Sequence, residues 1–200
     1  MPTLTIFAGM NGAGKSTLYY FQKSIFDPGL GVRINPDEIL QQNNGDWQNF
    51  SHQVKASKMA LEKINSCLDR GVSFNWETTI MGNFAINLIT KAKALGYTIN
   101  LNFLGVSKIE KSFRRIEHRV KNGGHGIPEK IVRHRFEHQF DNMGKILSMV
   151  DKAILYDNSH TLQIVGSYSQ NTLRIFNNAI PWTKEIVRQH QEYRNAPTKD

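Results

Sequence analysis

The 200-residue sequence is poor in cysteine and has no long apolar run. Its one cysteine, Cys67, excludes a disulfide within the chain and favours a reducing compartment, so we expect a cytoplasmic protein. No apolar run approaches the roughly 20 residues that a membrane-spanning helix needs, so we expect no contact with a membrane. The N-terminal segment MPTLTIFAG has no basic residue before its apolar stretch, which predicts a first strand rather than a signal peptide.

Acidic residues are fewer than basic ones. The chain has 25 Lys and Arg against 17 Asp and Glu, which gives a formal net charge of +8. Such an excess is typical of nucleic-acid-binding proteins, and also of sites that hold a polyanionic small molecule. The basic residues do not form one block, and glutamates are mixed with them in the densest region, 108–135. We therefore consider nucleic acid the less favoured partner.

Segments with strand and helix character alternate through most of the chain. No repeat, low-complexity segment or linker is present, which predicts a single domain over residues 1–200. The alternation predicts an α/β fold with a mostly parallel, five-stranded sheet flanked by helices. A C-terminal extension, about residues 160–191, is expected to add two strands and a short helix. The expected strands are Leu4–Ala8, Val32–Ile34, 72–79, Tyr97–Val106 and 153–157, and the main helices are Lys15–Ser24, Val54–Leu68, Asn83–Leu95, Ser107–Val120 and Glu129–Met149.

Two of the expected helix starts carry capping residues. Asn35 precedes Pro36 and Glu38, which take the first and third helical positions, so a helix is predicted directly after the second strand. Ser107 and Glu110 have the spacing of a capping box, in which each side chain bonds the other residue's backbone N–H. This pair predicts a helix that opens at Ser107.

The stretch GMNGAGKST, between the first strand and the first helix, fits the pattern G-x-x-x-x-G-K-[ST]. Glycines let backbone N–H groups turn inward around a phosphate, and the positive end of the helix adds to the attraction. Lys15 is expected to bridge the β- and γ-phosphates of ATP, and the Ser16 hydroxyl to ligate Mg²⁺. The residues expected to bind the nucleotide are Gly9, Asn11, Gly12, Ala13, Gly14, Lys15, Ser16 and Thr17.

Motors and guanine-nucleotide switches need motifs that this chain lacks. No Asn-Lys-x-Asp base reader is present, and the one apolar strand that ends in aspartate, AILYD, lies far from the phosphate loop. Asp157 is a candidate Mg²⁺ contact, but the favoured interpretation is that Asp157 or Asn158 shapes the base end of the nucleotide site or caps a turn. What remains suits a small kinase.

Acidic and hydroxyl side chains follow the second and third strands. Asp37 comes directly after the second strand, and the carboxyl ends of parallel strands face the ligand crevice. We therefore expect Asp37 to orient the acceptor hydroxyl, although the helix dipole alone would stabilise an aspartate there. Glu77, Thr78 and Thr79 follow the third strand and suit either binding of a polyhydroxylated acceptor or an outer contact with Mg²⁺, with a capped helix start as the structural alternative.

Arginines lie on both sides of the glycine-rich segment NGGHG. Two helices joined by such a hinge predict a lid over the phosphates, at about residues 107–147, with Arg119 and Arg135 directed toward the ligand. Arg114, Arg115 and Arg133 belong to the same cluster. His134 and His138 are spaced for a shared metal ion, but with no third ligand evident we interpret them as a solvated helix face. No role is assigned to His125.

The segments GMNGAGKST, INPDEI, FNWETT, RRIEHRVKNGGHGIPEKIVRHRF and LYDNS, in this order, resemble zeta-toxin-like P-loop kinases. The resemblance covers about residues 4–159 and implies a P-loop kinase fold that uses ATP and Mg²⁺. The best-known members phosphorylate a hydroxyl of a UDP-activated amino sugar. By this resemblance Lys15 and Ser16 hold nucleotide and metal, and Asp37 is the base. Glu77 and Thr78 contact the acceptor, and Arg119 and Arg135 stabilise the transferred phosphate.

The chain is shorter than such toxins, and nothing in its sequence indicates an antitoxin partner. The sequence therefore predicts a kinase acting on a small-molecule acceptor, with a sugar nucleotide as one candidate. A nucleic-acid end kinase and a nucleotide-binding regulatory module without transfer are the alternatives.

Overall fold

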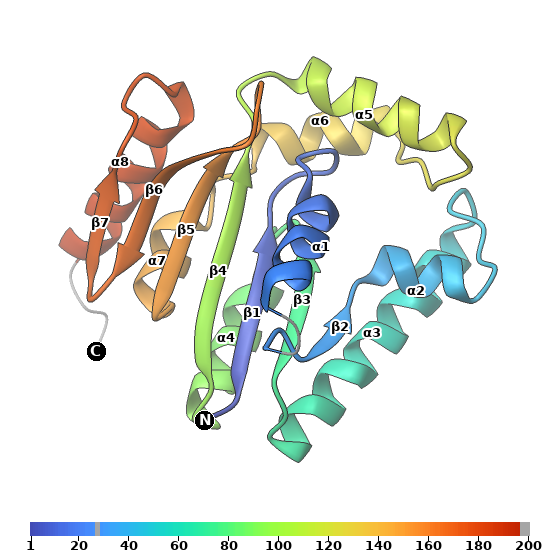
Figure 1. The fold of residues 1–200 in the computed structure, drawn as a ribbon, viewed down its shortest axis with the longest axis horizontal. Coiled ribbons are helices and arrows are strands. Elements are labelled where there is room, and N and C mark those ends of the chain that lie inside the picture. Colours follow the sequence, from blue (N-terminus) through green and yellow to red (C-terminus); the bar gives the residue numbers. More distant parts are fainter. Residues whose placement is uncertain (27–28, 197–200) are drawn as a thin grey trace.

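The computed structural model describes residues 1–26 and 29–196. Its strands form one seven-stranded sheet in the order β2-β3-β1-β4-β5-β6-β7. The first five strands in this order are parallel, and β6 and β7 are antiparallel to their neighbours (Figure 1). The strands are β1 (Thr3–Ala8), β2 (Val32–Ile34), β3 (Phe74–Thr78), β4 (Thr98–Gly105), β5 (Lys152–Asp157), β6 (Gln163–Ser169) and β7 (Thr172–Ile175).

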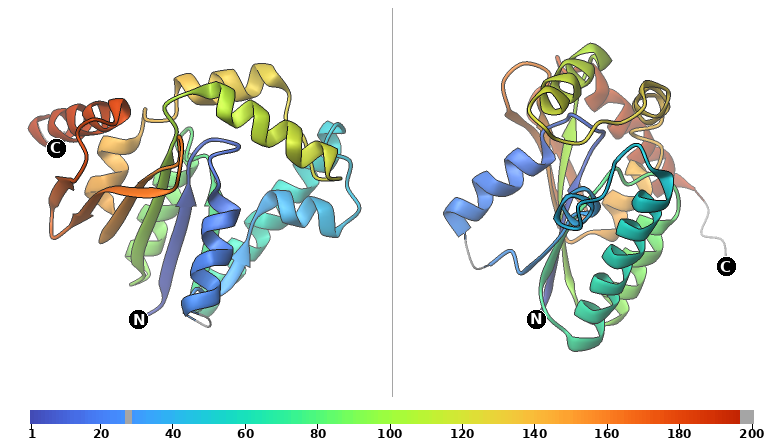
Figure 2. Two further views of the ribbon diagram at one scale, coloured as in Figure 1. Left: turned by 45° about the horizontal axis from the view of Figure 1, so that its top comes forward. Right: turned by 90° about the vertical axis from the view of Figure 1, so that its right-hand side faces the viewer.

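Helices cover both faces of the sheet and its upper end. Figure 2 shows α1 on one face, with α3 and α4 on the other. The helices α5 and α6 lie across the carboxyl ends of the parallel strands (Figure 1). The helices are α1 (Lys15–Phe26), α2 (Pro36–Gln42), α3 (Phe50–Arg70), α4 (Phe84–Ala94), α5 (Ile109–Lys121), α6 (Glu129–Glu137), α7 (Met143–Met149) and α8 (Pro181–Asn195). None of the described helices is both long and apolar enough to cross a membrane.

Strand β1 is buried on both sides and divides the core into two parts. Leu4, Ile6 and Ala8 face the larger cluster, which α3, α4, α7 and α8 cover, whereas Phe7 faces the smaller cluster beneath α1, α5 and α6. Side chains alternate between the two faces of a strand, and a central parallel strand has helices on both faces. The short, nearly continuous apolar run of β1 follows from this position.

The fold class predicted from the sequence is confirmed: five parallel strands alternate with helices. The expected two-stranded extension is present, and β6 pairs with β5 so that it widens the same sheet. The Asn35 cap is also observed, since its Oδ1 atom accepts a hydrogen bond of 3.0 Å from the Asp37 N–H.

The prediction of one helix over Glu129–Met149 is wrong, because α6 ends at Glu137 and α7 begins at Met143. The two helices pack on different core clusters, α6 on the smaller one and α7 on the larger one. Val132 of α6 belongs to the smaller core cluster, whereas Phe140 stacks on Trp182 of α8, with ring centroids 5.7 Å apart, in the larger one. A single straight helix cannot present one apolar stripe to both clusters, so the chain breaks between them.

The predicted capping box at Ser107 is also wrong. Helix α5 begins at Ile109 after Lys108, and no side chain caps it. Ser107 instead bonds the segment after β5: its N–H donates to Ser159 Oγ at 2.8 Å, and the two hydroxyls are 3.0 Å apart. Ser107 thus bonds Ser159, which is distant in the sequence, and not Glu110 of its own helix.

Candidate functional site

The loop between β1 and α1 has backbone conformations that only glycine adopts easily. Gly9, Gly12 and Gly14 have φ values of 141°, 76° and 102°. A Cβ atom at Gly9 would lie 2.3 Å from the Leu104 carbonyl oxygen, and one at Gly14 would lie 2.6 Å from Asn158 Nδ2. The glycines of the motif therefore allow the loop to turn tightly against β4 and the segment after β5.

A first cavity of about 460 Å³ opens on this loop. Its lining includes the loop residues Asn11, Gly12, Gly14, Lys15, Ser16 and Thr17, together with Asp37, Glu77, Arg115, Arg119 and Asn158. Two residues of the predicted nucleotide set, Gly9 and Ala13, are buried and do not line it. We call this space the loop cavity.

Glu77 is buried, lines the loop cavity and contacts polar groups from α1, from β2 and from Asn35, which caps α2. The Ser16 hydroxyl lies 3.0 Å from both carboxylate oxygens, and Asn35 Nδ2 donates to Oε2 at 3.1 Å. Arg33 Nη2 lies 2.5 Å from the same oxygen. Glu77 thus lies beside the Ser16 hydroxyl, which the sequence analysis expects to ligate Mg²⁺.

Lys15 is almost completely buried, with 7% of its side chain exposed. Its Nζ atom donates to the Met10 carbonyl at 3.1 Å and lies 3.9 Å from Glu77 Oε1. Burial lowers the pKa of Lys15 from its ordinary value, while the carboxylates of Glu77 and Asp37 oppose this shift. The ammonium group is thus held beneath the loop beside two negative charges.

Asp37, at the start of α2, faces His125 from the segment that joins α5 and α6. Its Oδ2 atom lies 2.7 Å from His125 Nε2, and its side chain is 41% exposed toward the cavity space. Burial alone would raise the pKa of the Asp37 carboxyl, but His125 and the charges of Lys15 and Arg119 outweigh it and lower the pKa. Asp37 is therefore a carboxylate at neutral pH.

Three arginines of α5 and α6 point to the loop. Arg115 Nη1 donates to the Gly12 carbonyl at 3.0 Å, and Arg135 Nη1 lies 2.5 Å from Asn11 Oδ1. Arg119 Nε donates to the His125 carbonyl at 2.7 Å. Its Nη2 atom is buried without a hydrogen-bond partner among the described residues, and Arg119 lines the loop cavity. A buried donor without a partner is uncommon in a folded protein and calls for an explanation.

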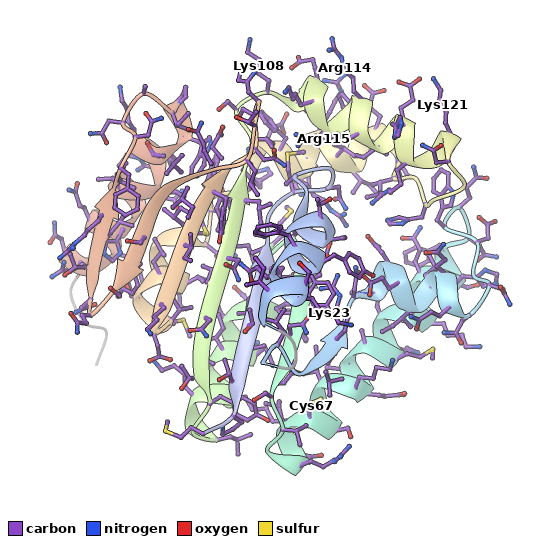
Figure 3. The ribbon with its side chains drawn as sticks, in the orientation of Figure 1. Lys23, Cys67, Lys108, Arg114, Arg115 and Lys121 are labelled. Atoms are coloured by element: carbon purple, nitrogen blue, oxygen red, sulfur yellow. The ribbon has the colours of Figure 1, made fainter. Side chains whose placement is uncertain are left out.

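The other two arginines of the cluster do not reach the loop. Figure 3 shows Arg114 on the outer side of α5, whereas Arg115 points inward. Arg133 is exposed and pairs with Glu129 of its own helix, with 2.9 Å between Nε and Oε1. The lid predicted from the sequence thus contributes Arg115 in addition to Arg119 and Arg135.

A second cavity, of about 240 Å³, adjoins the loop cavity. Thr78 and Thr79, two residues of the predicted acceptor set, line it together with Trp47 and Trp76. The Trp47 ring closes it by packing on the lid segment, since a Cβ atom at Gly126 would lie 2.6 Å from this ring. We call it the tryptophan cavity. It shares four lining residues with the loop cavity: Asn11, Lys15, Asp37 and Glu77.

Asp157 is fully buried and lines neither cavity. It accepts hydrogen bonds from Trp182 Nε1 at 2.8 Å and from Ser159 Oγ at 2.7 Å, so it holds α8 and the segment after β5. This matches the turn-capping alternative and not a metal contact. The neighbouring Asn158 does line the loop cavity, and its Nδ2 donates to the Ala13 carbonyl at 2.7 Å.

The structure supplies the third metal-ligand candidate that the sequence analysis did not find beside His134 and His138. Glu137 lies with them, and the ligand atoms of the three residues are within 4.8 Å of one another. All three are exposed, and none lines the loop cavity or the tryptophan cavity. The group therefore lies outside the candidate site.

The glycine loop at the end of β1, with a parallel sheet and an arginine-bearing lid above it, defines the class of P-loop phosphotransferases. The family comparison agrees: the zeta toxin model matches residues 1–180, and the chain belongs to this family. An uncharacterized protein of Haemophilus influenzae is 32% identical over 130 residues, which cover 65% of this chain and 89% of that protein.

Solved structures resemble the whole fold. The PezAT chromosomal toxin-antitoxin system of Streptococcus pneumoniae contains a chain that is 19% identical, with a TM-score of 0.64 and coverage of 98% of this chain and 86% of that one. The complex AvrRxo1-ORF1:-ORF2 with ATP contains a chain that is 17% identical, with a TM-score of 0.66. That match covers all of this chain and 66% of the other. At these identities the likeness concerns the fold.

Proposed function

We propose that the protein is an ATP- and Mg²⁺-dependent kinase that transfers the γ-phosphoryl group to a hydroxyl of a small molecule. The observation that carries this proposal is the junction of the two cavities at Lys15, Asp37 and Glu77. A nucleotide in the loop cavity and an acceptor in the tryptophan cavity would meet there. Holding both reactants in line at one point supplies much of the rate enhancement of phosphoryl transfer.

ATP fits the chemistry of the loop cavity. The tight glycine turns and the start of α1 offer backbone N–H groups, and Lys15 and Arg119 supply positive charge to the triphosphate. A small movement of the Arg119 side chain into the loop cavity would let its unpartnered Nη2 donate to a phosphate oxygen. The related fold of AvrRxo1-ORF1:-ORF2, which has been determined with ATP, supports this assignment.

Mg²⁺ fits the oxygen atoms beside Lys15. The Ser16 hydroxyl and the Glu77 carboxylate, 3.0 Å apart, are the hard oxygen donors that Mg²⁺ prefers. Ser16 would hold the ion, and Glu77 would hold its water shell. When bound, the ion neutralises the charge that develops on the β- and γ-phosphate oxygens.

Asp37 would act on the acceptor. As a carboxylate that lines both cavities, it can accept the proton of the acceptor hydroxyl while the oxygen attacks the γ-phosphorus. The bond from that phosphorus to the β,γ-bridging oxygen breaks, and ADP leaves. Arg119 and Arg135 would stabilise the transferring group, and Thr78 and Thr79 would bind the acceptor.

The test is Asp37→Asn. Because the change keeps the size of the side chain and removes the base, we expect phosphoryl transfer to fall by about 10²–10⁴-fold. Affinity for ATP in calorimetry should change by less than about threefold. The readout is phosphate added to a metabolite pool, detected by mass spectrometry. Asp69→Asn, on the exposed side of α3, is the control. Wild-type transfer by Asp37→Asn would contradict the role of Asp37.

Two further assignments need their own assays. A 5′-hydroxyl oligonucleotide offered as acceptor tests the nucleic-acid end kinase that the net charge of +8 would suit. Because the pneumococcal structure comes from a toxin-antitoxin system, an antitoxin partner is also a hypothesis for this chain, and co-purification with the neighbouring gene product tests it.

A further inference from the structure

Two histidines and a glutamate lie together at the exposed end of α6. His134, Glu137 and His138 have the i, i+3, i+4 spacing that places side chains on one face of a helix. The two histidine rings are neighbours, with centroids 4.5 Å apart, and the ligand atoms of the three residues lie within 4.8 Å of one another. The ligand atoms of one tetrahedral zinc ion are about 3.3 Å apart. Small rotations of these exposed side chains would therefore bring all three to one ion.

Asp141, in the turn after α6, supports His138. Its Oδ2 atom lies 2.8 Å from His138 Nδ1. A metal-binding histidine usually has its second ring nitrogen bonded to a carboxylate, which orients the ring and makes the nitrogen at the metal more basic. With Nδ1 bonded to Asp141, Nε2 is the nitrogen left for an ion. The pair has the arrangement of a metal ligand and its supporting carboxylate.

The glutamate of the group is available to an ion. Glu137 forms no ion pair with any residue that the structure describes. Arg133, one turn earlier, pairs instead with Glu129 at 2.9 Å and lies over the Phe113 ring. The carboxyl end of a helix also attracts cations, because its last carbonyl groups carry partial negative charge.

The kinds of donor atom select the metal. Two imidazole nitrogens and one carboxylate oxygen suit Zn²⁺, and the same set holds the ion in zinc sites that keep a fourth position for water. Mg²⁺ prefers oxygen donors alone, so it is a poor match for this group. The exposure of the three residues leaves the fourth position open to water.

We propose that His134, Glu137 and His138 bind one Zn²⁺ ion at the end of α6, with Asp141 as the supporting carboxylate of His138. The site lines neither the loop cavity nor the tryptophan cavity, and it does not depend on the proposed kinase function.

The ion would restrain a helix of the lid. His138 and Asp141 follow the last residue of α6, so Zn²⁺ would tie this turn to the end of the helix. The same helix carries Arg135, whose Nη1 lies 2.5 Å from Asn11 Oδ1 in the phosphate loop. Zinc would thus hold the helix that presents Arg135 to the loop.

The experiment is calorimetric titration of the untagged full chain with Zn²⁺, without ATP and with excess Mg²⁺ to compete for the oxygen donors of the loop cavity. We expect one Zn²⁺ per chain. His134→Ala and His138→Ala should each weaken binding by about tenfold or more, and Asp141→Asn by about tenfold. His160→Ala, at an exposed histidine outside the group, is the control and should leave the affinity unchanged. Absence of binding, or wild-type affinity in both variants of His134 and His138, would overturn the proposal.

Hydrogen exchange tests the restraint on the lid. Zn²⁺ should slow exchange of the backbone amides of residues 134–141 by about tenfold or more in the wild type and not in His134→Ala. Exchange in this segment that is the same with and without bound Zn²⁺ would contradict the restraint.

Discussion

The substitution Glu77→Gln removes one charge from the buried network and keeps the size of the side chain. Glu77 is 7% exposed and lies 3.9 Å from Lys15 Nζ, a separation at which two charges interact by about 4 kcal/mol at an effective dielectric constant of about 20. Removing one partner of a buried pair typically costs about 3–5 kcal/mol. Arg33 keeps Glu38 as a partner at 2.8 Å. We therefore expect the free energy of unfolding to fall by about 3 kcal/mol, the lower end of this range.

The matched control is Glu38→Gln. Glu38 also binds Arg33, but its side chain is 22% exposed, and Arg33 would keep Glu77. We expect a loss of about 1 kcal/mol or less. The free energy of unfolding of a protein of this size falls by about 2 kcal/mol per molar of urea. The urea concentration at the unfolding midpoint should therefore fall by about 1.5 M for Glu77→Gln and by about 0.5 M or less for the control. Equal shifts in the two variants would refute the view that Glu77 is the centre of the network.

Three further predictions concern catalysis. Lys15→Ala should abolish transfer and weaken ATP binding at least tenfold in calorimetry, and unchanged affinity would contradict its phosphate role. His125→Ala removes a contact that lowers the pKa of Asp37, so the pKa rises and the acid limb of kcat/KM should move to higher pH. An unmoved limb would show that His125 does not set the charge of Asp37. Arg135→Ala should lower kcat by about 10²-fold, whereas Arg133→Ala should not, and equal effects of the two would argue against a specific role of Arg135.

The parts of the site that are contiguous in sequence could be predicted from it. The glycine loop, its lysine and its serine lie within nine residues, GMNGAGKST, and the strand and helix around them follow from local patterns. The position of Asp37 directly after a strand predicts that it lies at the edge of the sheet where parallel strands end, and Asp37 lines a cavity there. The glycine-rich segment between two predicted helices indicates a lid, and Arg119 and Arg135 lie on these helices.

The rest depends on contacts between distant segments. Arg33 and Asn35 bind Glu77 from more than 40 positions away, and nothing in their local sequence indicates this pairing. His125 could be noticed in its hinge, but its partner Asp37 is known only once the lid is placed. The stripe over Glu129–Met149 looked continuous because periodicity does not show that Val132 and Phe140 belong to different core clusters.

The most direct test of the account is calorimetric titration of the purified, folded protein with ATP in the presence of Mg²⁺. The account predicts binding of one ATP per chain with a dissociation constant of about 1 mM or tighter, and a clear loss of affinity when EDTA removes the ion. Absence of binding heat at millimolar ATP would contradict the claim that the glycine loop holds a triphosphate.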